Sequence, residues 1–138
     1  MIASLVALSG LQANALRLDA SASNVANVNT SGATAKAAAA AALRGEAVAT
    51  GYQPLMVQQS TIAGYGVAAK VRADTSAPRP VYAPSSRQAD EDGMVAMPNI
   101  EVVDEVAAQI QAAHAYRANL SVIRASDEME GSLLDLSA

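Results

Sequence analysis

Apolar residues in the first part of the chain recur at alternating steps of three and four residues. They are Leu8, Leu11, Ala15, Leu18, Ala22 and Val25. This spacing is typical of the narrow a/d stripe of a coiled-coil helix. Asn27, Thr30 and Gly32 then supply residues that end helices and form turns. The pattern predicts a first helix from Ile2 to about Val28.

A second stripe with the same spacing lies near the carboxyl end. It consists of Val106, Ile110, Ala113, Tyr116, Leu120 and Ile123. Before it, Pro98 is followed by Asn99, whose side chain is suited to capping the free amides of a helix start. Glu101 and Glu105 would then lie near the positive end of the helix dipole. The pattern predicts a second long helix over residues 99–138 with Asn99 as its cap.

Between these stripes, glycines and prolines interrupt any long element. Alternating apolar and polar residues predict short strands at Leu55–Gln58, at Val67–Ala73 and around Val81–Tyr82. The alanine-rich stretch Thr34–Thr50 is compatible with a short helix or with a flexible insertion.

The predicted fold is therefore mainly α. Two long terminal helices pair as a coiled-coil-like hairpin, and an irregular middle segment contains short β-strands. We expect one structural unit with an amino-terminal assembly helix (1–31), a middle segment with an Ala-rich insertion (32–98) and a carboxy-terminal assembly helix (99–138).

The composition limits the core that this chain can build. It has 33 alanines among 138 residues and neither Phe nor Trp. A large apolar side chain contributes about 1.5–3 kcal/mol when fully buried, whereas alanine offers one methyl group. The composition therefore predicts narrow helix-to-helix contacts that neighbouring chains complete.

Charge and cysteine content exclude several classes of function. A net charge of −4 with nine Lys and Arg is incompatible with a strongly basic nucleic-acid surface. The absence of cysteine excludes disulfides and cysteine-containing zinc sites. The longest apolar run, Ala37–Leu43, is far shorter than the roughly 20 residues of a membrane span. We therefore expect no nucleic-acid partner and no integral membrane segment.

The charge is also unevenly distributed. Residues 1–44 carry a net +2 and residues 94–138 a net −5. Opposite signs favour antiparallel pairing within a subunit, or docking of one subunit's tail on another's head.

Three features invite a chemical interpretation. Gly64 to Ala69 reads G-x-G-x-x-A, but the residues after it alternate like a strand, so a glycine-lined turn is expected rather than a nucleotide site. His114, the one histidine, has no carboxylate three or four residues away to orient it. The acidic clusters at 90–92 and 127–130 lack calcium-loop spacing. We expect no catalytic, cofactor or metal site, and no enzyme.

Two stretches carry a family resemblance. Ala22-Ser23-Asn24-Val25-Ala26-Asn27-Val28-Asn29-Thr30 resembles the A-x-N-x-A-N-x-x-T signature of bacterial flagellar rod, hook and related axial proteins. Gly93-Met94-Val95-Ala96-Met97-Pro98-Asn99-Ile100-Glu101-Val102-Val103-Asp104-Glu105 resembles the G-x-V-x-x-P-N-V-x-V-x-x-E segment of proximal rod proteins. The following stretch around Tyr116 and Asn119 is also similar. The chain is thus similar to the flagellar basal-body rod family and most like its proximal rod (FlgC) branch.

The resemblance implies a structural subunit of the proximal rod, the axial drive-shaft tube used for motility. Its implied partners are other rod subunits, further copies of itself and the flagellar type III export apparatus, with no cofactor. Its implied place is the periplasm-spanning basal body, reached without a cleaved signal peptide. The implied assembly and motif residues are Leu11, Leu18, Asn24, Ala26, Asn27, Thr30, Pro98, Asn99, Val103, Glu105, Tyr116 and Asn119.

Two other interpretations remain open. Ala13-Asn14-Ala15 imitates a signal-peptide cleavage site, although no basic residue precedes Arg17. A secreted or periplasmic helical binding module, cleaved after Ala15, is therefore the main alternative, and a small nucleotide-binding enzyme is the next. The direct neighbours, stoichiometry, tube geometry and type of flagellar system, primary or secondary, stay open.

Overall fold

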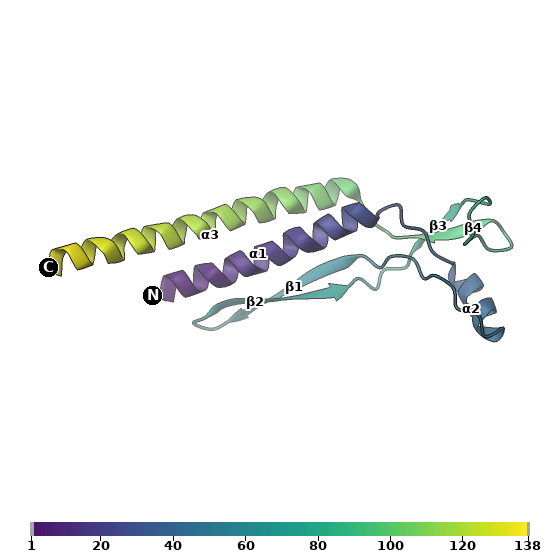
Figure 1. Cartoon of the computed structure of the whole chain (residues 1–138), viewed down its shortest axis with the longest axis horizontal. Coiled ribbons are helices and arrows are strands. Elements are labelled where there is room, and N and C mark those ends of the chain that lie inside the picture. The colour runs from purple at the N-terminus through teal and green to yellow at the C-terminus, as the bar shows by residue number, and fades with distance from the viewer. Residues whose placement is uncertain (1, 138) are drawn as a thin grey trace. The chain divides into compact units, whose positions relative to one another are not determined.

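The computed structural model describes residues 2–137, except for the side chains at positions 134, 136 and 137. The elements, labelled in Figure 1, are α1 (Ile2–Asn27), α2 (Ala35–Leu43), β1 (Leu55–Ile62), β2 (Gly66–Ala73), β3 (Arg79–Tyr82), β4 (Met94–Met97) and α3 (Val102–Ser137). Two long terminal helices with short antiparallel strands between them confirm the predicted fold class at that level.

The chain forms two compact units. The first combines α1 up to Ala22, the segment Met56–Arg72 and α3, and the second combines Ser23–Leu55 with Ala73–Val102. No helix in the described part of the chain is both long and apolar enough to span a bilayer.

In the first unit, α1 and α3 approach each other through small residues. The Ser21 hydroxyl donates to the Glu105 carbonyl oxygen at 2.9 Å. At the other end, a Cβ added to Gly10 would lie 2.6 Å from the Asn119 side-chain nitrogen. Because residue 21 lies opposite 105 and residue 10 opposite 119, the helices are antiparallel.

The predicted apolar stripes do not form most of this contact. Leu8 is 46% exposed, Val106 44% and Ile110 54%, whereas Leu11 is buried. The buried residues are instead Ala7, Leu11, Ala13, Asn14, Ala20 and Ser21 on α1, and Ala112 and Ser126 on α3. Small side chains let two helix backbones approach closely, so the larger aliphatic side chains are left outside. Coiled-coil pairing of the two helices stays a prediction.

The hairpin β1–β2 packs on α1 through one serine and one glycine. The Ser9 hydroxyl donates to the Val6 carbonyl at 2.7 Å and accepts the Val67 N–H at 3.0 Å. Gly64 and Gly66 both have positive φ, and the Tyr65 N–H bonds to the Ile62 carbonyl to close the turn. This confirms the interpretation of G-x-G-x-x-A as a turn. The first strand extends to Ile62, four residues beyond the prediction.

The second unit contains a strand that the sequence analysis missed. β3 and β4 pair antiparallel with Val81 opposite Val95, and Val95 is fully buried. On its other side β4 forms a two-bond bridge with Gly32 through the backbone of Ala96. Met94–Met97 reads as a continuous apolar run, so it gave no alternation signal.

The alanine run forms the helix α2, which resolves the alternative left open by the sequence. The Thr34 hydroxyl caps it by accepting the Ala37 N–H at 3.2 Å. The two ends of the segment that contains α2 lie side by side. The Ala33 N–H donates to the Ala49 carbonyl at 3.0 Å, and Gly51 lies against Gly32.

The predicted start of the second helix is wrong. α3 begins at Val102, three residues after Asn99, so Asn99 is an exposed residue before the helix and not its cap. Pro98 is buried, and residues 98–101 between β4 and α3 belong to no helix or strand.

We predict that Gly66→Ala destabilises the chain more than Gly64→Ala. Both glycines have positive φ, which costs a residue with a Cβ about 1 kcal/mol. A Cβ at Gly66 would also collide with the Ser9 side chain, whereas none lies within 4 Å at Gly64. We expect about 1–3 kcal/mol more loss for Gly66→Ala, measured by thermal unfolding with circular dichroism. Equal losses would mean that the hairpin does not pack on Ser9.

Candidate assembly surfaces

Asn24 joins the end of α1 to the start of β1. It is 2% exposed, and its side chain accepts the Leu55 N–H at 2.7 Å and donates to the Leu55 carbonyl at 2.9 Å. Its oxygen also accepts the Tyr52 hydroxyl at 3.0 Å, and Ser23 bonds to the same hydroxyl. The amide thus pairs with Leu55 as a neighbouring strand would. This motif residue has an internal, structural role.

Asn27 and Thr30 organise the end of α1. The Asn27 amide donates to the Ser23 carbonyl at 2.9 Å, and its oxygen accepts the Thr30 hydroxyl at 3.2 Å. The Thr30 N–H bonds to the Asn27 carbonyl. Side chain and backbone together therefore satisfy groups that a helix end leaves free.

The second motif, from Gly93 to Pro98, forms a turn and a buried strand. Gly93 has φ +74°, and a Cβ there would lie 2.9 Å from the Tyr82 ring. Val95 and Pro98 are buried. The motif therefore builds the interior of the second unit before the chain enters α3.

Apolar side chains gather on the outside of the first unit. On α3, Val103 is 79% exposed, and Val106 and Ile110 follow at helical spacing. On α1, Ile2, Leu5 and Leu8 are exposed. A monomer gains nothing from large aliphatic side chains in water, so clustered exposure is typical of surfaces that another protein covers.

The structure divides the predicted assembly residues into three groups. Inside their own unit lie Leu11, Asn24 and Pro98, with Leu18, Glu105 and Asn119 half-buried. Asn27 and Thr30 form the end of α1, and Ala26, Asn99, Val103 and Tyr116 are exposed. The backbone carbonyl oxygen of Glu105 accepts a hydrogen bond from the Ser21 hydroxyl. An intersubunit role for the exposed members stays a prediction.

Sequence reasoning missed several residues that shape these surfaces. Gly10 and Ser21 bring α1 and α3 together, and Tyr52 completes the network around Asn24. A periodicity of small residues, with Ala7, Gly10, Asn14 and Ser21 at steps of three, four and seven, was the available signal. The prediction followed large apolar residues instead.

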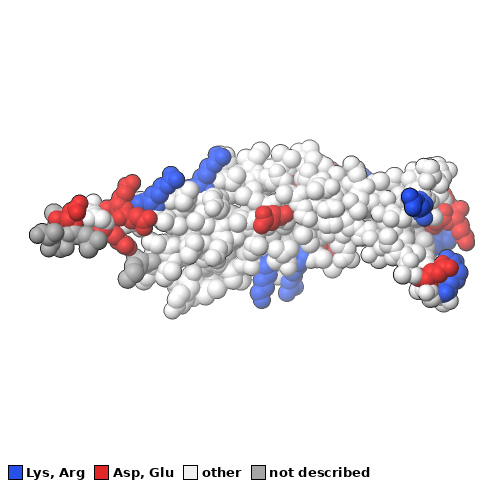
Figure 2. Space-filling view, in the orientation of Figure 1, with Lys and Arg blue, Asp and Glu red and all other residues white. Residues whose placement is uncertain are grey.

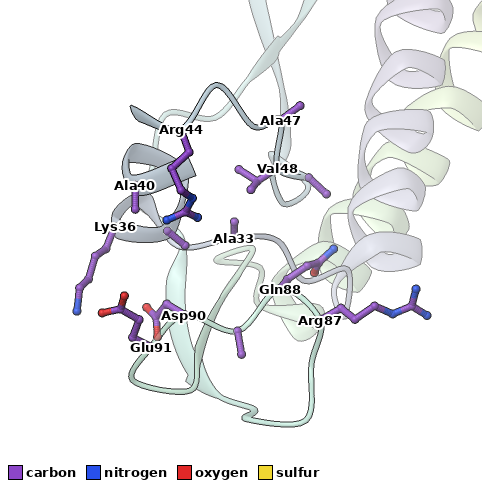
Figure 3. A pocket seen from close by; sticks show the side chains of 13 residues that line it. Ala33, Lys36, Ala40, Arg44, Ala47, Val48, Arg87, Gln88, Asp90 and Glu91 are labelled. Atoms are coloured by element: carbon purple, nitrogen blue, oxygen red, sulfur yellow. The ribbon is translucent and has the colours of Figure 1, made fainter. Parts of the chain in front are cut away.

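A cavity of about 440 Å³ lies between α2 and the loop before β4, within the second unit. Ala33, Ala40 and Val48 form part of its lining, and Lys36, Arg44 and Asp90 stand around it (Figure 3). Lys36 pairs with Asp92 at 2.7 Å, and Arg44 pairs with Glu46 at 3.1 Å. These charges are exposed and matched within the chain, so the cavity has no strong charge preference.

Asp90 holds the loop that borders this cavity. Its carboxylate accepts the Met94 N–H at 2.9 Å, the Thr34 hydroxyl at 2.8 Å and the Asp92 N–H at 3.0 Å. The bond from Met94, followed by that from Thr34, lowers the Asp90 pKa below its ordinary value of 3.8. The hydrogen bond and charge of Asp92 raise the Lys36 pKa.

The geometry offers little for chemistry. Across residues 2–137, no three His, Asp or Glu side chains come together as a metal site would require. His114 lies exposed on α3.

Comparison with known proteins finds similarity to flagellar basal-body rod families at both ends of the chain. Residues 5–34 match a family described as "Flagella basal body rod protein", and residues 91–136 match "Flagellar basal body rod FlgEFG protein C-terminal". A 55-residue stretch is 44% identical to the flagellar basal-body rod protein FlgC of Agrobacterium fabrum strain C58. Both ends of the chain are therefore similar to flagellar basal-body rod proteins, and one stretch is similar to FlgC. This confirms the resemblance read from the motifs.

These matches have a defined extent. The aligned stretch covers 40% of this chain and 40% of FlgC, and the two family matches leave residues 35–90 between them. The matched families are structural and non-enzymatic, which supports the expectation that the chain is not an enzyme. They do not favour a cleaved binding module.

We predict that Asn24→Ala costs about 2–4 kcal/mol of unfolding free energy. The change removes the side-chain partner of the Leu55 N–H and carbonyl and one of the two partners of the Tyr52 hydroxyl, at a buried position. Urea unfolding followed by circular dichroism measures the loss. Asn29→Ala, at an exposed position in the turn that follows α1, is the matched control and should cost little. Similar losses for both variants would contradict the structural role of Asn24.

We predict that the loop around Asp90 loosens in acid. Because the folded pKa of Asp90 lies below its unfolded value, the carboxylate stabilises the fold above about pH 3.8. That contribution falls away as the pH drops through the lowered folded pKa. The protection of the Met94 amide against hydrogen exchange, taken relative to its intrinsic exchange rate at each pH, should therefore decrease below pH 3.8 in the native chain. In Asp90→Asn this protection should already be reduced at neutral pH and should lack the acid step.

Proposed function

We propose that this chain is a structural subunit of the proximal part of the flagellar basal-body rod. The matches at both ends support the family role, and one structural observation carries the mechanism. The helices α1 and α3 meet through small residues and present Leu5, Leu8, Val106 and Ile110 outward. A subunit built in this way is completed by neighbours that cover those side chains.

Burial supplies the driving force for this assembly. The largest fully buried side chain in the described part of the chain is Val95, so the isolated subunit has a thin core. Each aliphatic side chain that a neighbour covers contributes about 1.5–3 kcal/mol at full burial. Assembly would therefore add to the stability of α1 and α3 in the single chain.

The partners follow from the proposed role. They are other rod subunits and further copies of this chain, in an axial tube within the cell envelope that transmits rotation for motility. Delivery through the flagellar type III export apparatus, without a cleaved signal peptide, belongs to the same proposal. Continuity of α1 through Ala15, with Ala13 buried, is consistent with an intact first helix in the assembled subunit.

The motif residues receive two kinds of role under this proposal. Asn24, Asn27, Thr30 and Pro98 fix the internal geometry of the subunit. Val103 and Tyr116, with Val106 and Ile110, form the surface that neighbouring helices contact. The terminal segments 1–31 and 99–138 act as assembly helices. The middle segment 32–98, whose hairpin packs on α1 of the same chain, lies outside the contacts between subunits.

We expect Val106→Gln with Ile110→Gln to block assembly without unfolding the subunit. Both side chains are exposed in the monomer, so the change removes apolar area only from the contact with neighbours. Incorporation into isolated basal bodies and swimming in soft agar are the readouts, with circular dichroism of the purified chain as the folding check.

The matched control for this test is Met56→Gln with Ile62→Gln on β1. These positions have similar exposure but lie on the hairpin rather than on α3. The control variant should assemble and support motility. Normal incorporation of the α3 variant would overturn the proposed contact surface.

A further inference from the structure

The outer side of α3 carries a self-complementary stripe in its second half. The stripe consists of Arg117, Ser121, Arg124, Glu128, Gly131 and Asp135, and every one of these residues is exposed. Their steps of four, three, four, three and four residues keep them on one face of the helix. Ala112, Asn119 and Ser126, which are buried or face α1, lie on the other side.

Figure 2 shows this distribution of charge. Basic side chains stand on the edge of α3, and an acidic cluster follows toward the carboxyl end marked in Figure 1. Glu128 and Asp135 belong to the acidic part and Arg117 and Arg124 to the basic part. The stripe thus changes sign once, between Arg124 and Glu128.

The charges of the stripe are opposite at equal distances on the two sides of position 126. Reversing the stripe places Arg117 against Asp135, Arg124 against Glu128, and Ser121 against Gly131. Opposite charges meet opposite charges, and two small residues meet in between. Such self-complementarity is what an isologous twofold contact requires, because residue i contacts j while j contacts i.

We infer that two copies of this chain pair antiparallel through the second halves of their α3 helices. The occupant of the stripe is a second copy, and each dimer contains two Arg117–Asp135 and two Arg124–Glu128 pairs. The Ser121–Gly131 pairs allow a close approach, since a Cβ at Gly131 would meet nothing within its own chain. Exposed ion pairs are individually weak, so this dimer is weak and salt-sensitive.

The inference goes beyond the proposed rod function and does not depend on it. A twofold contact closes on itself, whereas a tube grows by contacts that do not close. The dimer is therefore a form of the unassembled subunit. It leaves the apolar residues Val103, Val106 and Ile110 outside the paired segment, available to other partners.

Charge reversal tests the pairing without any rod component. Arg117→Glu with Arg124→Glu makes the stripe all acidic, and Glu128→Arg with Asp135→Arg makes it all basic. Each variant alone should self-associate at least about tenfold more weakly than the native chain in sedimentation equilibrium at low salt. An equimolar mixture of the two variants should form a heterodimer.

The control for charge is Lys70→Glu with Arg72→Glu, two exposed residues of β2. It changes the net charge as much as the acidic α3 variant and should leave self-association unchanged. A native chain that stays monomeric at low salt overturns the inference. Failure of the mixture to associate, with both variants helical by circular dichroism, overturns it as well.

Cysteine crosslinking tests the direction of pairing on a background without native cysteines. A mixture of Ser121→Cys chains and Gly131→Cys chains should give a disulfide-linked dimer, because these positions are opposite each other. Chains that carry only Ser121→Cys should not crosslink with one another. A mixture of Ala118→Cys chains and Gly131→Cys chains should not crosslink either, because Ala118 is exposed beside the stripe rather than on it. Efficient crosslinking of Ser121→Cys alone would indicate parallel helices and contradict the antiparallel dimer.

Discussion

Two helix backbones can approach closely only where neither carries a large side chain, and this steric condition governs the first unit. At Gly10 the space that a Cβ would occupy is filled by Asn119, and at Ser21 a short hydroxyl reaches the backbone of the opposite helix. Once the contact consists of small residues, the aliphatic side chains of both helices have nowhere inside to go. The outward apolar surface is thus a direct result of the inner contact.

This condition also explains how far the sequence could predict the fold. The positions of the long helices followed from their three-and-four periodicity, and the end of α1 followed from Asn27 and Thr30. The buried side of each helix did not follow, because Leu8 and Ile110 were assumed to face inward. Hydrophobicity alone did not predict which side of each helix faces the other helix, because packing within this chain is decided by side-chain size.

The other discrepancies have local causes. β4 was missed because Met94–Met97 is apolar throughout, as expected of a strand that is paired on both sides, with β3 at one edge and Gly32 at the other. Asn99 was taken for a cap because its residue type suits one, yet residues 98–101 form no helix and α3 begins only at Val102. The roles of Asn24 and Tyr52 depend on a contact across nearly thirty residues of chain, which local patterns do not reveal.

The contact between the two ends of the segment that contains α2 has a practical consequence. Residues 33 and 49 are hydrogen-bonded to each other, and Gly32 and Gly51 are in contact, so the segment that carries α2 begins and ends at one place in the second unit. The intervening stretch lies between the two segments that match flagellar proteins. An epitope tag or a small fluorescent label spliced into the exposed turn at Gly45 would therefore report the position of the subunit in living cells while leaving both terminal helices intact.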